Sequence, residues 1–126
     1  MTPGKAYIYA EKYGSLEETR EIVCEDPEFA YEYAKNIDKC PREDTRKAAC
    51  KNFKYAYLYA RDIDKKPRDD TRDAACKNSE HAYFYTIVVD KEFKENTWLA
   101  VKNTEYEEKY RKIFNELIEI NELYNF

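Results

Sequence analysis

Hydrophobic positions in the middle of the chain recur with the period of an α-helix. Apolar side chains fall at i, i+3, i+4 and i+7, as in Ala56, Tyr59, Ala60 and Ile63. A strand would instead alternate apolar and polar residues with a period of two. The pattern therefore predicts amphipathic helices, and the same spacing is found in two flanking segments: Ala30, Tyr33, Ala34 and Ile37, and Ala82, Tyr85, Thr86 and Val89.

These helical segments belong to an internal repeat. The word Ala-Tyr-x-Tyr-Ala occupies residues 6–10, 30–34 and 56–60, and a variant ending in threonine occupies residues 82–86. Residues 30–52 and 56–78 differ at only six of 23 positions, which indicates an internal duplication. The second, third and fourth copies are 26 residues apart. Repeats of this length bury their apolar faces by stacking on their neighbours.

Capping residues divide each unit into two helices. Thr2 and Asp26 precede prolines, and Asn52, Asn78 and Asn103 stand at equivalent places, so each is predicted to cap a longer first helix. A second, shorter helix then begins among acidic residues, which favour the positive end of a helix dipole. In the first unit, Ser15 and Glu18 form the S-x-x-E pattern of a capping box.

We therefore predict an all-α fold with one domain over residues 1–126. It is a short α-solenoid of about four stacked helical hairpins at about residues 5–103, followed by a longer C-terminal capping helix at about 104–126. The C-terminal segment also favours a self-association helix, because its apolar residues alternate spacings of four and three as a coiled coil requires. Those residues are Tyr106, Tyr110, Ile113, Leu117, Ile120 and Tyr124.

Composition narrows the class of protein. A chain of 126 residues with 43% hydrophobic residues can bury a core, while two glycines and four prolines disfavour a glycine-rich phosphate loop. The net charge of −4 predicts neither a basic nucleic-acid surface nor a dense acidic mimic of DNA. No apolar run reaches the roughly 20 residues of a membrane span, and no signal-peptide pattern precedes the first repeat. We expect a cytoplasmic protein.

Three of the four cysteines follow the repeat. Cys24, Cys50 and Cys76 occupy one register, and packed helices hold equivalent positions about 8–10 Å apart, farther than the roughly 7 Å that a disulfide permits. We expect reduced thiols that act as small apolar groups, with Cys40 on the surface. No CxxC pair or histidine cluster indicates a metal site, and no cofactor is expected.

The unit A-Y-x-Y-A-x-x-I-x-K, followed by a turn with proline and arginine and a restart led by Asp or Asn, resembles a family of tandem 26-residue helical repeats in bacteriophage and bacterial genomes. Residues 26–34, D-P-E-F-A-Y-E-Y-A, are most similar to the family's D-P-x-x-A-Y-x-Y-A junction. The resemblance covers roughly residues 5–103. Family units commonly carry a W-P-E-A-E-like segment where this chain has residues 42–46 and 68–72, each beginning and ending in arginine. The resemblance implies a helical-repeat fold and a phage or bacterial origin, in which case the compartment is the host cytoplasm, and it implies no reaction.

No catalytic constellation is recognisable. His81 is the only histidine and replaces an aromatic residue of other units, so we interpret it as an aromatic packing substitute or a partly exposed polar residue. Nothing assembles a nucleophile, a base and an oxyanion stabiliser, and we expect no enzyme activity. The repeated residues that could contact a partner instead are Tyr7, Tyr31, Tyr57, Tyr83, Arg20, Arg42, Arg46, Arg68, Arg72 and Trp98.

Two functions remain as hypotheses. The first is a non-enzymatic protein-interaction module, in which tyrosines and arginines at equivalent places form a binding surface; a phage accessory or anti-defence protein that binds a bacterial protein fits the resemblance. The alternative is a protein that binds single-stranded nucleic acid or a nucleotide, with tyrosines stacked on bases and arginines on phosphates. The tyrosines and arginines also have ordinary structural explanations, namely packing between helices and pairing with carboxylates.

Overall fold

A computed structural model describes residues 1–124, and the last two residues of the predicted C-terminal helix lie outside the described residues. Residues 1–124 form helices and turns and contain no strand, which confirms the all-α class. The α-helices are α1 (Pro3–Tyr13), α2 (Glu17–Val23), α3 (Pro27–Tyr33), α4 (Glu43–Ala49), α5 (Phe53–Tyr59), α6 (Asp69–Ala75), α7 (Ser79–Phe84), α8 (Glu95–Val101) and α9 (Glu107–Tyr124).

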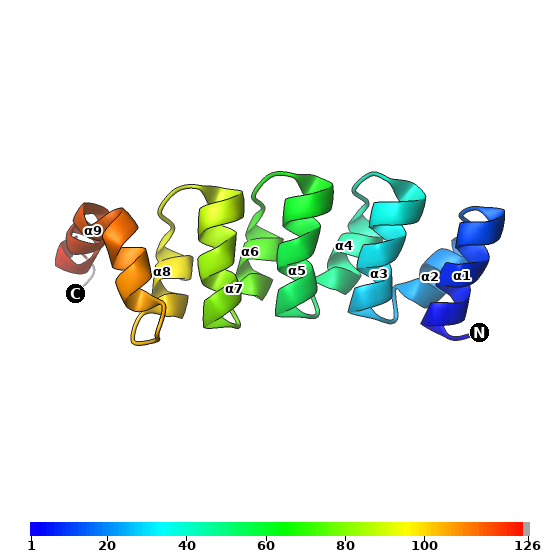
Figure 1. Ribbon diagram of the computed structural model, residues 1–126, viewed down its shortest axis with the longest axis horizontal. Coiled ribbons are helices and arrows are strands. Elements are labelled where there is room, and N and C mark those ends of the chain that lie inside the picture. The colour runs from blue at the N-terminus through cyan, green and yellow to red at the C-terminus, as the bar shows by residue number, and fades with distance from the viewer. Residues whose placement is uncertain (125–126) are drawn as a thin grey trace.

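The helices form a linear stack of hairpins. In Figure 1 the first helices of the units, α1, α3, α5 and α7, stand side by side as one row, and the second helices, α2, α4, α6 and α8, lie behind them. Each first helix packs on the second helix of its own unit and on the first helix of the next. The predicted stack of four hairpins with a longer C-terminal helix is thus confirmed.

The first helices of the second, third and fourth units end in a π-helical turn, a feature that the sequence pattern did not predict. These turns are η1 (Ala34–Asp38), η2 (Ala60–Asp64) and η3 (Tyr85–Asp90). In each, the amide of the following lysine donates to a carbonyl five residues earlier, for example Lys65 N to Ala60 O at 2.8 Å. The wider turn carries the chain past the end of the helix toward the second helix of the unit.

Most predicted caps are confirmed, and two are wrong. Asp26, Asn52 and Asn78 accept hydrogen bonds from amides in the first turn of the following helix. Ser15 does not cap α2, because Leu16 occupies the cap position and the Ser15 hydroxyl lies 2.7 Å from the Tyr33 hydroxyl instead. Asn103 has a φ of 63° and lies outside α9, which begins only at residue 107.

The interior consists of successive layers between units. Alanines at the start and end of the repeated word are fully buried, which allows the helices to approach closely, and a tyrosine fills the space beside them. One such layer joins Ala34, Ala49 and Tyr59, and the next joins Ala60, Ala75 and Tyr85. The alternation of small and large residues in the sequence is therefore the packing pattern of the stack.

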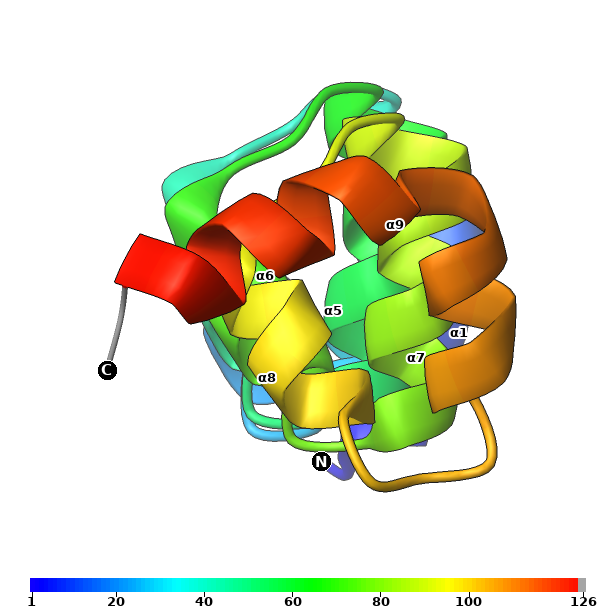
Figure 2. The same ribbon diagram turned by 90° about the vertical axis from the view of Figure 1, so that its left-hand side faces the viewer.

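Helix α9 is longer than the others but is not straight. Phe114 has φ −125° and ψ 27°, outside the helical region, and the helix bends there. Figure 2 shows the first part running beside α7 and the second part crossing over the end of the stack near α8. Ile118 and Tyr110 are fully buried against Trp98, so α9 caps the last hairpin as predicted.

The bend corrects one detail of the coiled-coil prediction. A continuous seam from Tyr106 to Tyr124 is wrong, because the break at Phe114 turns the two halves in different directions. Tyr110 faces the stack, whereas Ile113, Leu117 and Ile120 remain about half exposed. Self-association through the second half of α9 stays a prediction.

Candidate interaction surface

A buried pair of hydroxyls joins each unit to the next. The Tyr59 hydroxyl lies 2.8 Å from the Thr45 hydroxyl and also bonds to the backbone amide and carbonyl of Arg42, each at 3.0 Å. The same arrangement recurs at every junction between units: Tyr33 with Thr19, Tyr85 with Thr71, and Tyr110 with Thr97. Tyr110 shows that the first half of α9 occupies the place of a fifth first helix.

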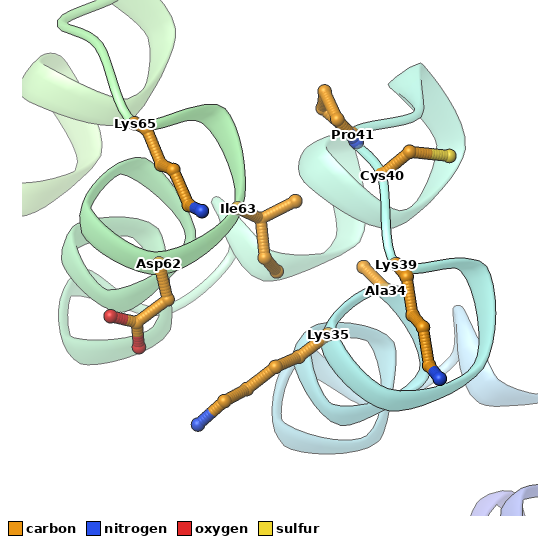
Figure 3. Close-up of a pocket in the computed structure, with 8 residues that line it drawn as sticks. All are labelled: Ala34, Lys35, Lys39, Cys40, Pro41, Asp62, Ile63 and Lys65. Atoms are coloured by element: carbon orange, nitrogen blue, oxygen red, sulfur yellow. The ribbon is translucent and has the colours of Figure 1, made fainter.

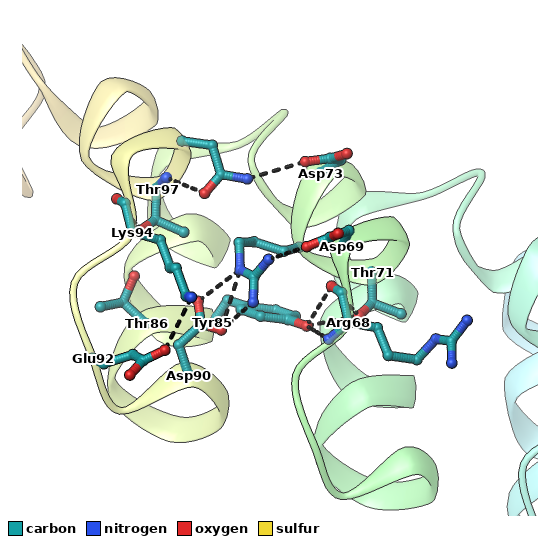
Figure 4. A network of polar contacts seen from close by, with 12 residues as sticks. Arg68, Asp69, Thr71, Asp73, Tyr85, Thr86, Asp90, Glu92, Lys94 and Thr97 are labelled. Carbon is teal, nitrogen blue, oxygen red and sulfur yellow. Dashed lines mark hydrogen bonds and ion pairs between the residues drawn. The ribbon is translucent and has the colours of Figure 1, made fainter. Parts of the chain in front are cut away.

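Buried ion pairs cross the same junctions. The Arg72 guanidinium donates to both carboxylate oxygens of Asp90 at distances of 2.7–3.1 Å. The Arg46 guanidinium donates to both carboxylate oxygens of Asp64 in the same way. Each arginine also lies over the ring of the layer tyrosine, and the Arg72 guanidinium is 5.7 Å from the centre of the Tyr85 ring. Figure 4 shows the Tyr85 hydroxyl beside Thr71 and Arg68 at this junction. The hydrogen bonds to Asp90 raise the pKa of Arg72 further above its ordinary value, so the guanidinium stays charged.

The first junction divides its arginine between two acids. Arg20 donates to Asp38 at 2.5 Å and to Asp44 at 2.7 Å. One buried oxygen of Asp38 has no hydrogen-bond partner within residues 1–124. Burial tends to raise the pKa of Asp44, but the hydrogen bonds from Arg20 and the Thr45 amide outweigh it and the pKa of Asp44 is lowered.

These contacts change the interpretation of the three arginines that recur at equivalent positions of the second helices. Arg20, Arg46 and Arg72 were candidates for partner binding, yet their exposed fractions are 3%, 9% and 6%. A guanidinium that already binds a buried carboxylate cannot contact a partner without opening the junction. The three arginines are structural connectors between units and not surface groups.

The remaining candidates divide between surface and interior. Trp98 is fully buried beneath Arg111 and α9. Arg42 is exposed and Arg68 is partly exposed, each near an aspartate two residues later, at 4.0 Å and 3.2 Å. Exposed pairs of this kind contribute little stability, so Arg42 and Arg68 remain available to a partner.

The four candidate tyrosines recur at equivalent positions of the first helices, and we call them the tyrosine ladder. Two of them are buried and two are partly exposed. Tyr31 and Tyr57 are only 4% and 7% exposed, whereas Tyr7 and Tyr83 are partly exposed. The Tyr31 hydroxyl donates to Asp62 in the next unit, and burial together with this bond raises the pKa of Tyr31. The tyrosine ladder borders the contacts between neighbouring first helices.

Each tyrosine of the ladder packs on a second ring from the next unit, and sequence reasoning did not identify these rings as a surface. The ring centroids are 5.5–6.1 Å apart in all four pairs, a normal separation for aromatic contacts. The second rings are partly exposed. We call these eight residues the aromatic face: Tyr7 with Phe29, Tyr31 with Tyr55, Tyr57 with His81, and Tyr83 with Tyr106.

A signal for this face was present in the sequence. The residue directly before the repeated word is Phe29, Tyr55 or His81 in three successive units, so an aromatic ring recurs at one register. His81 packs 4.9 Å from Phe53 and its Nδ1 lies 2.8 Å from Asn78 Oδ1. Burial lowers the pKa of His81, and the partly exposed ring packs among Phe53, Tyr57 and Phe84.

The face carries polar groups among its rings. The Tyr106 hydroxyl donates to Glu80 at 2.7 Å, and this bond raises the pKa of Tyr106 to about 12. Arg61 and Asp62 form an ion pair at 2.7 Å beside Tyr57, with the guanidinium 5.5 Å from the ring. The surface is therefore apolar along its middle and has paired charges beside it.

The thiols lie where the repeat predicted. All four cysteines are unpaired; Cys24, Cys50 and Cys76 are half-buried and Cys40 is exposed. Burial raises the pKa of Cys24, Cys50 and Cys76 to about 11. Among residues 1–124, no three His, Cys, Asp or Glu side chains gather as metal ligands would.

Comparison with protein-family models, with curated proteins and with solved structures gives no match. The similarity to phage and bacterial helical repeats therefore stays an expectation from the residues. Within residues 1–124, no helix is both long enough and apolar enough to cross a membrane.

Proposed function

We propose that this protein is a non-enzymatic helical-repeat module that binds another protein through the aromatic face. The observation that carries the proposal is the recurrence, at each of four junctions, of a ring pair with at least one partly exposed member. Aromatic residues are enriched at the energetic centres of protein interfaces, and rigid rings lose little entropy on binding. Following the resemblance, the partner is a bacterial protein and the module a phage accessory protein.

The alternative function, binding of single-stranded nucleic acid or a nucleotide, has weaker support than protein binding. It required tyrosines to stack on bases while neighbouring arginines met phosphates. Arg46 and Arg72 are instead bonded to Asp64 and Asp90 inside the stack, and Tyr57 is buried beside His81. The aromatic face has acidic neighbours such as Glu80, which favours a protein partner over a polyanion. The four unpaired thiols fit a reducing compartment such as the cytoplasm.

Site-specific photocrosslinking in the source cell tests the proposal. A photoreactive phenylalanine in place of Tyr55 retains an aromatic ring in the middle of the aromatic face. Matched controls carry the same group at Lys47 or Asp73, exposed and equivalent positions on α4 and α6 behind the row. We expect a discrete crosslinked product from position 55 alone. Equal products from all three positions, or none from position 55, would contradict binding through this face.

A further inference from the structure

The edge of the stack that carries the turns between first and second helices has an excess of free positive charge. At the second, third and fourth units most carboxylates of this edge are engaged by arginine or lysine, as Asp38, Asp64 and Asp90 are. Glu43 and Glu95 are without an ion pair among the described residues. Five lysines of the edge also have no ion pair in residues 1–124: Lys35, Lys39, Lys65, Lys66 and Lys91.

This local excess contrasts with the net charge of −4 for the whole chain. Lys35 lies 5.6 Å from the centre of the Tyr31 ring, whereas the ammonium groups of Lys39, Lys65, Lys66 and Lys91 have no described partner. Arg42 and Arg68 lie on the same edge in weak exposed pairs. We call the five lysines the lysine edge.

Three of these lysines occupy a backbone conformation that disfavours lysine. Lys39, Lys65 and Lys91 have φ values of 56°, 55° and 56°, in the left-handed region where glycine is the usual residue. The Cβ of a side chain there is sterically strained relative to the right-handed region. The first hairpin closes differently, with Gly14 at φ 90° and ψ 171° and no π-helical turn before it. Lysine is thus placed three times where the turn itself favours another residue.

A hollow lies between two of these lysines. It has a volume of about 340 Å³ between the second and third units, with Lys35, Lys39 and Lys65 on its rim and Pro41 and Ile63 among its lining. Figure 3 shows Lys35 extending toward the unit that carries Asp62 and Lys65. The Asp62 carboxylate is already bonded to Arg61 and Tyr31. The hollow therefore presents ammonium groups around a small apolar patch.

We propose that the lysine edge binds an extended acidic peptide segment, with carboxylates near every third residue. Equivalent positions of packed helices are about 8–10 Å apart, so Lys39, Lys65 and Lys91 form a ladder of that spacing. A polyproline-type chain rises about 3.1 Å per residue, which places every third side chain about 9 Å further along and on the same side. None of the described residues that line the hollow has an aromatic ring, so bases of a nucleic acid have nothing to stack on there.

Fluorescence anisotropy of a labelled peptide tests this ladder. The probe, called the spaced peptide, has glutamate at every third position with prolines between. The control, called the blocked peptide, has the same composition but carries its glutamates in one continuous block. We expect the spaced peptide to bind more tightly than the blocked one, and to weaken several-fold from low to physiological ionic strength. Equal affinity for the two peptides, or no binding of the spaced peptide at low salt, would overturn the proposal.

Two double variants separate the ladder from general charge. Lys39→Gly with Lys65→Gly removes two rungs while relieving the left-handed strain, and we expect affinity to fall by about fivefold or more with no loss of thermal stability. Lys51→Gln with Lys77→Gln makes the same charge change at the opposite ends of the hairpins and should leave binding within about twofold. An equal loss in both variants would reduce the effect to net charge and refute a defined edge.

A third arm addresses the class of the ligand. A labelled oligothymidylate of matched charge should bind more weakly than the spaced peptide. Tighter binding of the oligonucleotide, lost in the Lys39→Gly and Lys65→Gly variant, would overturn the assignment to an acidic peptide. Of the lysine edge, Lys35 contacts the aromatic face at Tyr31, whereas the two substituted lysines, Lys39 and Lys65, have no described contact with its rings. Photocrosslinking at position 55 can therefore fail while the edge still binds, and the two proposals are distinguishable.

Discussion

The Tyr59 hydroxyl lies 2.8 Å from the Thr45 hydroxyl in the buried layer between two units, and both residues are fully buried. Tyr59→Phe keeps the ring and removes this bond together with the bonds to the Arg42 backbone. We expect the free energy of unfolding to fall by about 1–3 kcal/mol, because buried polar groups lose their partner. Urea denaturation followed by circular dichroism measures the change.

Tyr9 supplies a matched control for that substitution. It is the equivalent tyrosine of the first unit, is 38% exposed, and has no described unit before it to provide a threonine. Tyr9→Phe should change the free energy of unfolding by less than about 0.5 kcal/mol. A similar cost in both variants would show that the Tyr–Thr bond is not the origin of the effect.

The Arg72 and Asp90 pair gives a second test. Replacing Asp90 with Asn leaves the buried Arg72 guanidinium with only the exposed carboxylate of Asp69 as a countercharge, and we expect a loss of about 3–5 kcal/mol in the free energy of unfolding. Replacing Arg72 with Met and Asp90 with Leu together should cost much less, since no buried charge remains. Denaturation of Arg72→Met, Asp90→Leu and the double completes the cycle.

The exposed pair of Arg68 and Asp70 is the control for that cycle. Their guanidinium and carboxylate are 3.2 Å apart and both side chains are more than one third exposed. Arg68→Gln should change stability by about 0–1 kcal/mol. If it proved as costly as Asp90→Asn, burial would not be what makes the Arg72 pair important.

Lys65→Gly should stabilise the fold. Lys65 has a φ of 55°, where glycine avoids the steric cost that any other residue meets. Glycine also loses more entropy on folding, so we expect a net gain of about 0.5–1 kcal/mol in the free energy of unfolding. Thermal or urea unfolding measures it. A loss of stability would mean that the Lys65 side chain supports the turn.

The cysteines should differ in reactivity. Burial raises the pKa of Cys24, Cys50 and Cys76 to about 11, so few of these thiols are ionised at pH 7, whereas Cys40 is exposed. Because the thiolate is the nucleophile, we expect iodoacetamide to modify Cys40 first in the native protein. Peptide mass spectrometry over time identifies the modified residue. Unfolding in urea should equalise the four rates, and uniform rates in the native protein would contradict the burial.

Alkaline pH should weaken the layers between units. Burial raises the pKa of Tyr59, Tyr85 and Tyr110 above the ordinary value of about 10. The unfolded chain loses these protons first, so stability is fully present below about pH 10 and is lost as the pH rises through the folded pKa values. Unfolding curves at increasing pH, with tyrosinate absorbance, follow both events. Tyrosines that ionise at their ordinary pKa in the folded protein would contradict the prediction.

The sequence predicted the packing of the stack better than its polar contacts. The helical spacing of apolar residues correctly predicted the burial of Ala56, Tyr59 and Ala60. The spacing and the burial have the same cause, because the apolar face of a helix is the face that packs on its neighbours. Arg72 looks like a surface residue to any rule based on polarity, and only the fold shows Asp90 beside it. A weaker signal existed, because arginine and aspartate recur together with a separation of 18 residues in three pairs: Arg20 with Asp38, Arg46 with Asp64, and Arg72 with Asp90.

The aromatic face and the lysine turns show a similar limit. The ring at position 55 follows the repeat, but whether it is covered depends on the distance between neighbouring helices, which one sequence does not specify. The left-handed φ of Lys65 follows from the π turn before it, and no glycine marks that turn in the sequence. The bend at Phe114 likewise lacks the proline or glycine that usually marks one.

The Tyr–Thr bond also makes the units interchangeable in register. Tyr59 bonds Thr45, and Tyr85 bonds Thr71, with the same separation of 14 residues. Removing residues 53–78, one unit of 26 residues, would bring Tyr85 into the place of Tyr59, opposite Thr45, and Asp90 into the place of Asp64, opposite Arg46. A deletion that is not a whole number of units would separate these partners. The length of the array can therefore change in whole units, and with it the number of aromatic pairs, while the chemistry of each junction stays the same.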